Sequence, residues 1–129
     1  MKTFSKFLSL ALASLVMLGA NAAVAQVSYT NTPLLVIRFN QPRVMYQQPL
    51  YTSVKQAFAA KPNVMFNLVS LVPVTADKEN NAKLASLASS NVGMVVNDMI
   101  QMGIPQNRIR VSNQSQDGLE SHEIHMFVE

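Results

Sequence analysis

The strongest constraint on the fold is an apolar run at residues 64–72, with the sequence VMFNLVSLV. Only Asn67 and Ser70 interrupt it, and Pro73 follows it directly. A short run of this composition, stopped by proline, predicts a strand in the middle of a sheet. Such a strand is stable only when other strands flank it and helices cover it, so the rest of the chain has to supply both.

Three further segments have the composition of strands. Residues 34–39 form a nearly continuous β-rich run, LLVIRF, while residues 108–111 and 122–128 alternate between apolar and polar side chains. Alternation with a period of two indicates a strand that is buried on one face. The polar residues 112–118, SNQSQDG, predict a turn between the last two strands.

Two segments have helical periodicity, residues 49–60 and about 82–102. Pro49 suits the first turn of the first helix, where its missing N–H would have no partner. Asp77 is a candidate N-cap for the second helix, and Gly103 is a candidate left-handed stop. The apolar stripes are Leu50, Val54, Ala57 and Phe58 in the first helix, and Leu84, Leu87, Val92, Val95, Val96, Met99 and Ile100 in the second.

The predicted order is therefore strand, helix, strand, helix, strand, strand. The first two crossovers are long enough to make the strands they join parallel. The last connection is short, which favours a hairpin-like return. These features predict an α/β (α+β) two-layer sandwich, in which a mixed four-stranded sheet carries both helices on one face.

Residues 1–25 have the three parts of a secretory signal. Lys2 and Lys6 precede a twelve-residue apolar run at 7–18, and Ala-Val-Ala at 23–25 is a small-x-small cleavage pattern. As a helix, that run would reach about 18 Å, which is short of the roughly 30 Å hydrocarbon core of a bilayer. We expect a cleaved signal peptide at 1–25, a flexible lead-in at 26–33 and one domain at 34–129, with a retained N-terminal anchor as the alternative.

The charge of the predicted mature chain excludes two classes of partner. The whole chain has ten Lys and Arg against seven Asp and Glu, a net charge of +3, but two of the lysines lie in the leader. Eight basic and seven acidic residues then remain, a net charge of +1. A nucleic-acid-binding or membrane-anchoring face would need denser positive charge. The chain also has no cysteine, so an exported domain of this sequence is held by its core without disulfides.

The residues that could bind a metal are few. His122 and His125 are three apart on a predicted strand, so they point to opposite faces and cannot share one ion. Met94, Met99 and Met102 lie on a predicted helix, where a thioether copper site is one interpretation and core packing is the other. We expect core packing, and we predict no metal and no cofactor.

The sequence also lacks the usual signals of catalysis. It has no cysteine and no Gly-x-Ser-x-Gly motif, and Ser86, Ser89 and Ser90 lie along the second helix without a predicted base beside them. Arg38, Arg108 and Arg110 have two interpretations, a small anion-facing patch or solvated strand residues with cross-strand partners such as Glu123, and we expect the second. We therefore expect a protein that is not an enzyme.

The second helix and the residues after it resemble the OmpA-like family of cell-envelope domains. The family pattern is Leu-Ser-x-x-Arg-Ala-x-x-Val, a Leu four positions on, a Gly four beyond that, then Ile-Pro and a strand. The corresponding residues here are Leu87, Ala88, Asn91, Val92, Val95, Met99, Gly103, Ile104 and Pro105. The predicted order of elements is also similar, so the resemblance extends over nearly all of residues 34–129.

The resemblance implies a sandwich fold, a periplasmic location and, in the family, an Asp and the helix Arg that hold a diaminopimelate of peptidoglycan. Asp77 falls near the position of the Asp, and Asn91 stands at the position of the Arg. An Asn cannot provide the two charge-assisted hydrogen bonds of a guanidinium to a carboxylate, which are worth about 1.5–3 kcal/mol. The chain therefore resembles a degenerate member of the family.

Three functional hypotheses follow. The first is an exported, non-enzymatic envelope protein that serves as an interaction or assembly module, with envelope or secretion-system proteins as partners. The second is a genuine peptidoglycan binder that uses another cation, Arg38 or Arg43. The third is a small periplasmic hydrolase or metal-binding protein.

Overall fold

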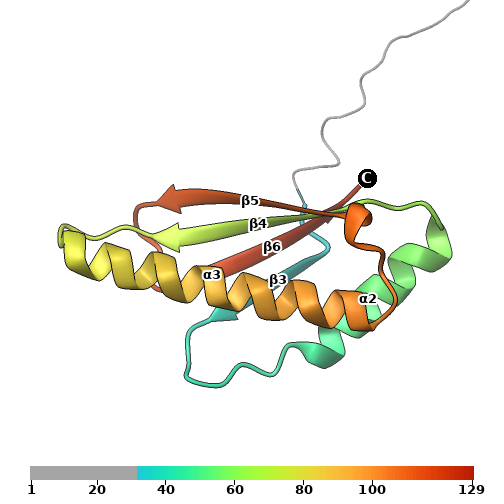
Figure 1. Ribbon diagram of the computed structural model, residues 1–129, viewed down its shortest axis with the longest axis horizontal. Coiled ribbons are helices and arrows are strands. Elements are labelled where there is room, and N and C mark those ends of the chain that lie inside the picture. The colour runs from blue at the N-terminus through green and yellow to red at the C-terminus, as the bar shows by residue number, and fades with distance from the viewer. Residues whose placement is uncertain (1–31) are drawn as a thin grey trace, which may run out of the picture. The chain divides into compact units, whose positions relative to one another are not determined.

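The computed structural model describes residues 32–129, and Pro33–Glu129 form one compact unit. The predicted signal peptide at 1–25 and nearly all of the predicted lead-in at 26–33 lie outside the described residues. Within the described part, the order of elements is the predicted one (Figure 1). The elements are β3 (Leu35–Phe39), α2 (Gln47–Ala60), β4 (Phe66–Pro73), α3 (Lys78–Gln101), the 3₁₀ turn η2 (Gln106–Arg108), β5 (Ile109–Gln116) and β6 (His122–Val128).

The four strands form one open mixed sheet in the order β3-β6-β4-β5. β4 and β5 are parallel, while β6 is antiparallel to both of its neighbours, β3 and β4. Both helices contribute to a single core on one side of this sheet (Figure 1). The predicted α+β two-layer sandwich, with a mixed four-stranded sheet and two helices, is thus confirmed.

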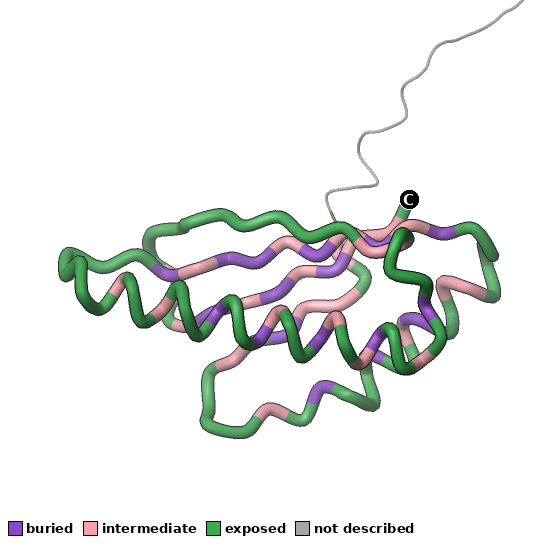
Figure 2. Tube along the Cα trace, viewed as in Figure 1, coloured by how far each residue is buried: buried purple, intermediate pink, exposed green. Residues whose placement is uncertain are grey.

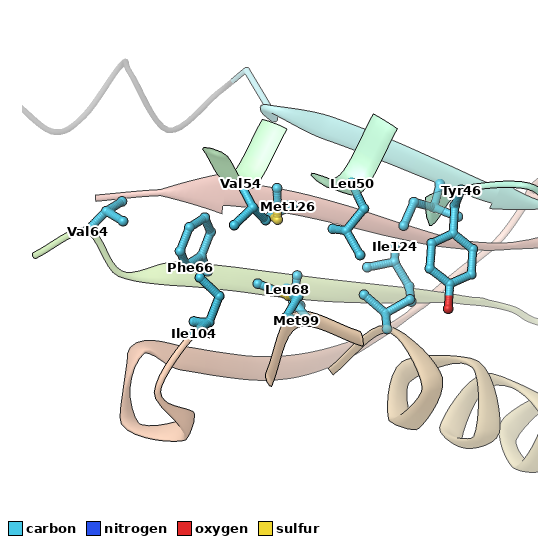
Figure 3. Packing of buried hydrophobic residues seen from close by; sticks show 12 residues of the cluster. Tyr46, Leu50, Val54, Val64, Phe66, Leu68, Met99, Ile104, Ile124 and Met126 are labelled. Atoms are coloured by element: carbon cyan, nitrogen blue, oxygen red, sulfur yellow. The ribbon is translucent and has the colours of Figure 1, made fainter. Parts of the chain in front are cut away.

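The core follows from the period-two alternation of the strands. Phe66 and Leu68 of β4 lie beside Ile124 and Met126 of β6 on the face of the sheet that the helices cover. All four side chains are at most 1% exposed. Figure 3 shows their side chains meeting those of the two helices. The helix residues of this cluster are Leu50, Val54, Val95 and Met99. Met99 is therefore a core residue, as the sequence predicts. The same prediction is wrong for Met94, and Leu87 and Ile100 of the predicted apolar stripe are exposed as well, at 48%, 55% and 40% respectively.

The length of β5 corrects one prediction. The strand was expected at 108–111 and a turn at 112–118, but β5 extends to Gln116 and pairs with β4 through eight consecutive residue pairs. Its polar side chains give no strand signal because seven of its eight residues are exposed. A strand at an exposed edge needs no apolar face, so polar residues are tolerated in it.

The position of β6 corrects a second prediction. A hairpin-like return would have placed β6 beside β5, but β6 lies between β3 and β4. β6 carries His122, Ile124 and Met126 on its covered face, whereas β5 has Val111 as its only apolar residue after Ile109. The more apolar strand is buried more completely in the middle of the sheet, so the polar strand is left at the edge.

The ends of α3 match their sequence signals. Asp77 is its N-cap, and one carboxylate oxygen accepts a hydrogen bond from the backbone N–H of Glu79 at 3.0 Å. Gly103 follows the helix with a φ of +102°, the left-handed conformation that glycine adopts without strain. Within residues 32–129, no helix combines the length and the apolar character that crossing a bilayer requires.

The buried stripe of α2 makes a matched test of this core possible. Leu50→Ala removes a side chain that is 0% exposed, and Leu87→Ala makes the same change at a helical position that is 55% exposed. We expect Leu50→Ala to lower the free energy of unfolding by about 2–5 kcal/mol, measured by urea denaturation, because it leaves a cavity. Leu87→Ala is expected to cost about 0.5 kcal/mol or less. Equal losses in the two variants would contradict this assignment of the core.

Candidate functional site

The two residues predicted from the resemblance, Asp77 and Asn91, lie at different places on α3. Asp77 is exposed at the N-cap, where its carboxylate is engaged with the first turn. Asn91 is 6% exposed and faces the sheet. They are fourteen positions apart, which at about 1.5 Å per residue is a distance of roughly 21 Å along the helix. The structure therefore does not bring the two side chains together around one small ligand.

Asn91 takes part in a buried chain of hydrogen bonds instead. Its amide nitrogen Nδ2 lies 3.2 Å from Nδ1 of His122, and Nε2 of the same imidazole lies 2.7 Å from Oγ of Ser70. These three residues are the buried polar side chains of the described core, with exposures of 6%, 3% and 0%. The chain links α3, β6 and β4 through their side chains.

The direction of these hydrogen bonds follows from the groups involved. An amide nitrogen can only donate, so Nδ1 of His122 accepts from Asn91 in the orientation that the amide has here. The ring proton then lies on Nε2, which donates to Oγ of Ser70. Activation of a serine requires the opposite arrangement, in which the imidazole accepts the hydroxyl proton. As arranged here, the chain links α3, β6 and β4 through buried side chains.

The surroundings of His122 favour its neutral form. Burial lowers the pKa of His122, and the carboxylate of Glu123 opposes this shift more weakly. The ring of Phe39 stacks on the imidazole with the two centroids 5.3 Å apart and an interplanar angle of 19°. A proton on Nδ1 would also face the donor Nδ2 of Asn91, so the charged form loses a hydrogen bond as well as its hydration.

A groove runs beside Asn91, between α3 and the segment that precedes α2. It consists of two adjoining hollows of about 190 and 490 Å³, which share Pro42, Val44, Tyr46 and Met94 as lining residues. Asn91 and Leu87 line the smaller hollow, and Arg43 and Met45 the larger one. Among the described residues that line it, Arg43 alone carries a charge. We refer to these two hollows together as the α3 groove.

A hydrogen bond fixes one wall of the α3 groove. The hydroxyl of Tyr46 donates to Oδ2 of Asp98 at 2.6 Å, and the Tyr46 ring meets the ring of Phe39 edge-on at 6.2 Å between centroids. Tyr46 is 5% exposed, and Figure 3 shows its hydroxyl at the margin of the core. Burial, together with the nearby Asp98 carboxylate, raises the pKa of Tyr46 well above its ordinary value. The segment before α2 is thereby fastened to α3.

Three side chains give the α3 groove an apolar and accessible rim. Met45 is 77% exposed, Leu87 is 55% exposed and Met94 is 48% exposed. Leu87 and Met94 are seven residues apart and therefore lie on one side of α3. Methionine side chains are flexible and polarizable, and they recur at surfaces that adapt to more than one partner.

The arginines and His125 lie elsewhere. Arg38 is on the sheet face opposite the helices, where its Nε lies 3.4 Å from Oε2 of Glu123, the cross-strand partner expected from the sequence. His125 is on the same open face and contacts the other oxygen of Glu123 at 2.8 Å. His122 and His125 therefore point to opposite faces, as their spacing predicts. Arg110 pairs with Glu129 at 3.3 Å.

The contact between Ser70 and His122 is not predicted by any pattern described above. A signal for it is present, since Ser70 continues the buried alternation of Phe66 and Leu68, and His122 that of Ile124. A polar residue at a buried strand position requires a hydrogen-bond partner. Two such residues on two strands of one small domain are therefore candidates for a mutual contact.

Comparison of the chain with protein-family models and with curated proteins finds no match. The fold and the geometry described above are thus the basis for an interpretation of function.

The buried imidazole makes stability depend on pH. Because the pKa of His122 lies below its ordinary value of 6.5 in the folded chain, the unfolded chain takes up this proton at a higher pH than the folded chain does. The contribution that neutral His122 makes to the free energy of unfolding is thus fully present above pH 6.5. It is lost as the pH falls through the lower pKa that His122 has in the folded chain. We expect the free energy of unfolding to decrease over that range in urea denaturation measured between about pH 5 and pH 8.

Substitution of each histidine separates the pH dependence of stability due to His122 from that due to other titrating groups. His122→Gln removes the buried imidazole, so the free energy of unfolding of this variant is expected to fall less at acidic pH than that of the unmodified protein. His125→Gln, on the opposite face, is the matched control and keeps the contribution of His122. The same slope in His122→Gln and in the unmodified protein would show that burial does not suppress protonation of His122.

Proposed function

We propose that this chain is an exported, non-enzymatic protein of the periplasm, a degenerate OmpA-like domain that serves as an interaction or assembly module of the cell envelope. The observation that carries the proposal is the α3 groove. At the position where the family resemblance implies a guanidinium, Asn91 is bound to His122, and the surface beside it is apolar and accessible.

Several features support an OmpA-like domain. The pattern along α3, from Leu87 to Gly103 and Pro105, is the one that carries the resemblance. The two-layer sandwich is the fold that the resemblance implies, and the order of elements agrees with it. The predicted signal peptide at 1–25 supports export, and an OmpA-like domain supports a periplasmic location.

The lining of the α3 groove favours a protein partner. Met45, Leu87 and Met94 offer apolar contact area, while Arg43 offers one positive charge at the side of the larger hollow. We therefore infer that the occupant is a segment of another envelope protein, with apolar side chains that enter the groove and a carboxylate that pairs with Arg43. Envelope or secretion-system components are the class of partner that the proposal names.

The buried chain of Asn91, His122 and Ser70 gives little support to the hydrolase alternative. Ser70 is 0% exposed, and the imidazole donates to its hydroxyl. Within residues 32–129, no group of three or more His, Cys, Asp or Glu residues is arranged to hold an ion.

Peptidoglycan binding is the second candidate, and Arg43 is the observation that favours it. Arg43 lines the same groove as Met94 and Tyr46, next to the hollow that contains Asn91. A cation near the position of the missing guanidinium is what binding of a diaminopimelate carboxylate would require. Arg38 does not fit this role because it lies on the opposite face of the sheet, with Glu123.

The two candidates are distinguished by mixing the purified protein with peptidoglycan sacculi and centrifuging. We expect the protein to stay in the supernatant, because Asn91 cannot bind a carboxylate as an arginine does. Pelleting that free diaminopimelate competes with, and that Arg43→Ala abolishes but Arg38→Ala does not, would contradict the proposal and establish the second candidate.

The protein partner is tested by affinity capture from an envelope extract with matched variants. Leu87→Asp and Met94→Asp place a charge in the groove and are expected to lower capture of the partner about tenfold or more. Ile100→Asp makes a similar change at an α3 position that is 40% exposed and outside the groove, and it is expected to have no effect. Equal capture by all variants would place the interaction away from the α3 groove.

A further inference from the structure

β5 is an exposed strand at the edge of the sheet. Among the described strands it pairs with β4 alone, and residues 110–116 are all exposed. In the tube of Figure 2, β5 is coloured as exposed along almost its whole length, beside β4, which is buried or half-buried. The backbone N–H and C=O groups on its outer side therefore have no partner strand within residues 32–129.

This edge lacks the features that usually protect an edge strand. Ile109–Gln116 contains no proline and no lysine, and its eight consecutive pairs with β4 leave no room for a bulge. Its single charged residue, Arg110, already pairs with Glu129 on the open face of the sheet. Long, regular edges without such features are able to pair with another strand.

The surface beside this edge also has space for another chain. A hollow of about 410 Å³ lies between β5 and α3, with small side chains on the helix side, Ala85, Ala88 and Ser89. Val111 faces it from β5 and is 44% exposed. These α3 residues belong to a different stripe from Leu87 and Met94, so this hollow is separate from the α3 groove.

The charges at the two ends of β5 are opposite. Arg108 and Arg110 lie at its beginning, and Asp117 and Glu120 follow its end. An antiparallel second copy of β5 would place the basic end of each strand near the acidic end of the other, whereas a parallel copy would place like charges together. Because Arg110 is paired with Glu129 of its own chain, this complementarity rests mainly on Arg108 and Asp117, and it favours the antiparallel orientation.

We propose that two copies of this chain associate through antiparallel pairing of their β5 strands, which joins the two four-stranded sheets into one of eight strands. The pairing is isologous, with a twofold axis perpendicular to the sheet. About this axis, a residue that faces the helices in one copy lies opposite a residue that faces the helices in the other copy. One residue near the middle of Ile109–Gln116 therefore lies opposite its own counterpart, and that residue is Ser112 or Asn113. Val111 of each copy is covered by the joined sheet.

The first test measures the molar mass of the purified protein in solution by light scattering or sedimentation. We expect twice the chain mass at high micromolar concentration. Ser112→Lys combined with Gln114→Lys places four lysines near the axis of the dimer and is expected to weaken association about tenfold or more. Gln48→Lys with Gln56→Lys adds the same charge on α2, where both residues are exposed, and is expected to leave the dimer intact.

The second test uses the absence of cysteine from the chain. A cysteine at the twofold axis has its Cα about 4.5–5.5 Å from its counterpart, which is within disulfide range. Under mild oxidation, either Ser112→Cys or Asn113→Cys is expected to form a covalent dimer much faster than Gln48→Cys. Because a single exposed cysteine does not disturb the core, this test does not depend on the double lysine variant folding.

A third variant set tests the orientation. Asp117→Lys puts like charges together at both ends of the pair and is expected to weaken the dimer, while adding Arg108→Glu is expected to restore it. A monomer at every concentration, or a dimer that the lysines at 112 and 114 and the cysteines at 112 and 113 leave unaffected, would overturn the proposal. Either result leaves the function proposed for the α3 groove standing, since its variants are on another surface.

Discussion

The hydrogen-bonded chain of Ser70, His122 and Asn91 is the constraint on which the rest of the domain depends. An imidazole that is 3% exposed is tolerated only if both ring nitrogens have partners, and here these partners come from β4 and α3. The chain therefore fixes the position of the long helix over the sheet. It also engages the amide nitrogen of Asn91, which is therefore directed at His122 and not at the adjacent groove. The apolar rim beside Asn91 is formed by Leu87 and Met94.

The elements were predictable from the sequence, but their arrangement in the sheet was only partly so. Apolar runs and helical stripes predicted the strands and helices because each is a local pattern, and the N-cap at Asp77 and the stop at Gly103 followed from local chemistry. The place of β6 between β3 and β4 depends on which strand buries more apolar area, which is a comparison over the whole chain. The second half of β5 was missed because an exposed edge strand made of Ser, Asn and Gln has the composition of a turn.

For the candidate site, the motif along α3 identified Asn91 as a position of interest but not what it does. Its partner His122 is 31 residues away along the chain, on a strand whose neighbours were wrongly expected. The segment 40–46, which lines the α3 groove, has no periodic pattern, and it is held by the burial of Tyr46, its contact with Phe39 and its hydrogen bond to Asp98. Contacts of this kind depend on the folded arrangement of several elements, so single-segment patterns do not predict them.

The two surfaces proposed for this domain use different stripes of the same helix, and their combination has a consequence for binding. α3 presents Leu87 and Met94 to the groove, and Ala85 and Ala88 to the hollow beside β5. A dimer formed across β5 has its twofold axis perpendicular to the sheet, so both helical layers, and with them both grooves, lie on the same side of the joined sheet. Two grooves on one side can engage a partner that is itself repeated, such as an oligomeric envelope assembly. The second contact is then intramolecular and strengthens binding beyond the affinity of either groove alone. In the proposed dimer, a small domain with one modest apolar groove would thus gain stronger attachment through pairing of its edge strand, without enlarging its core.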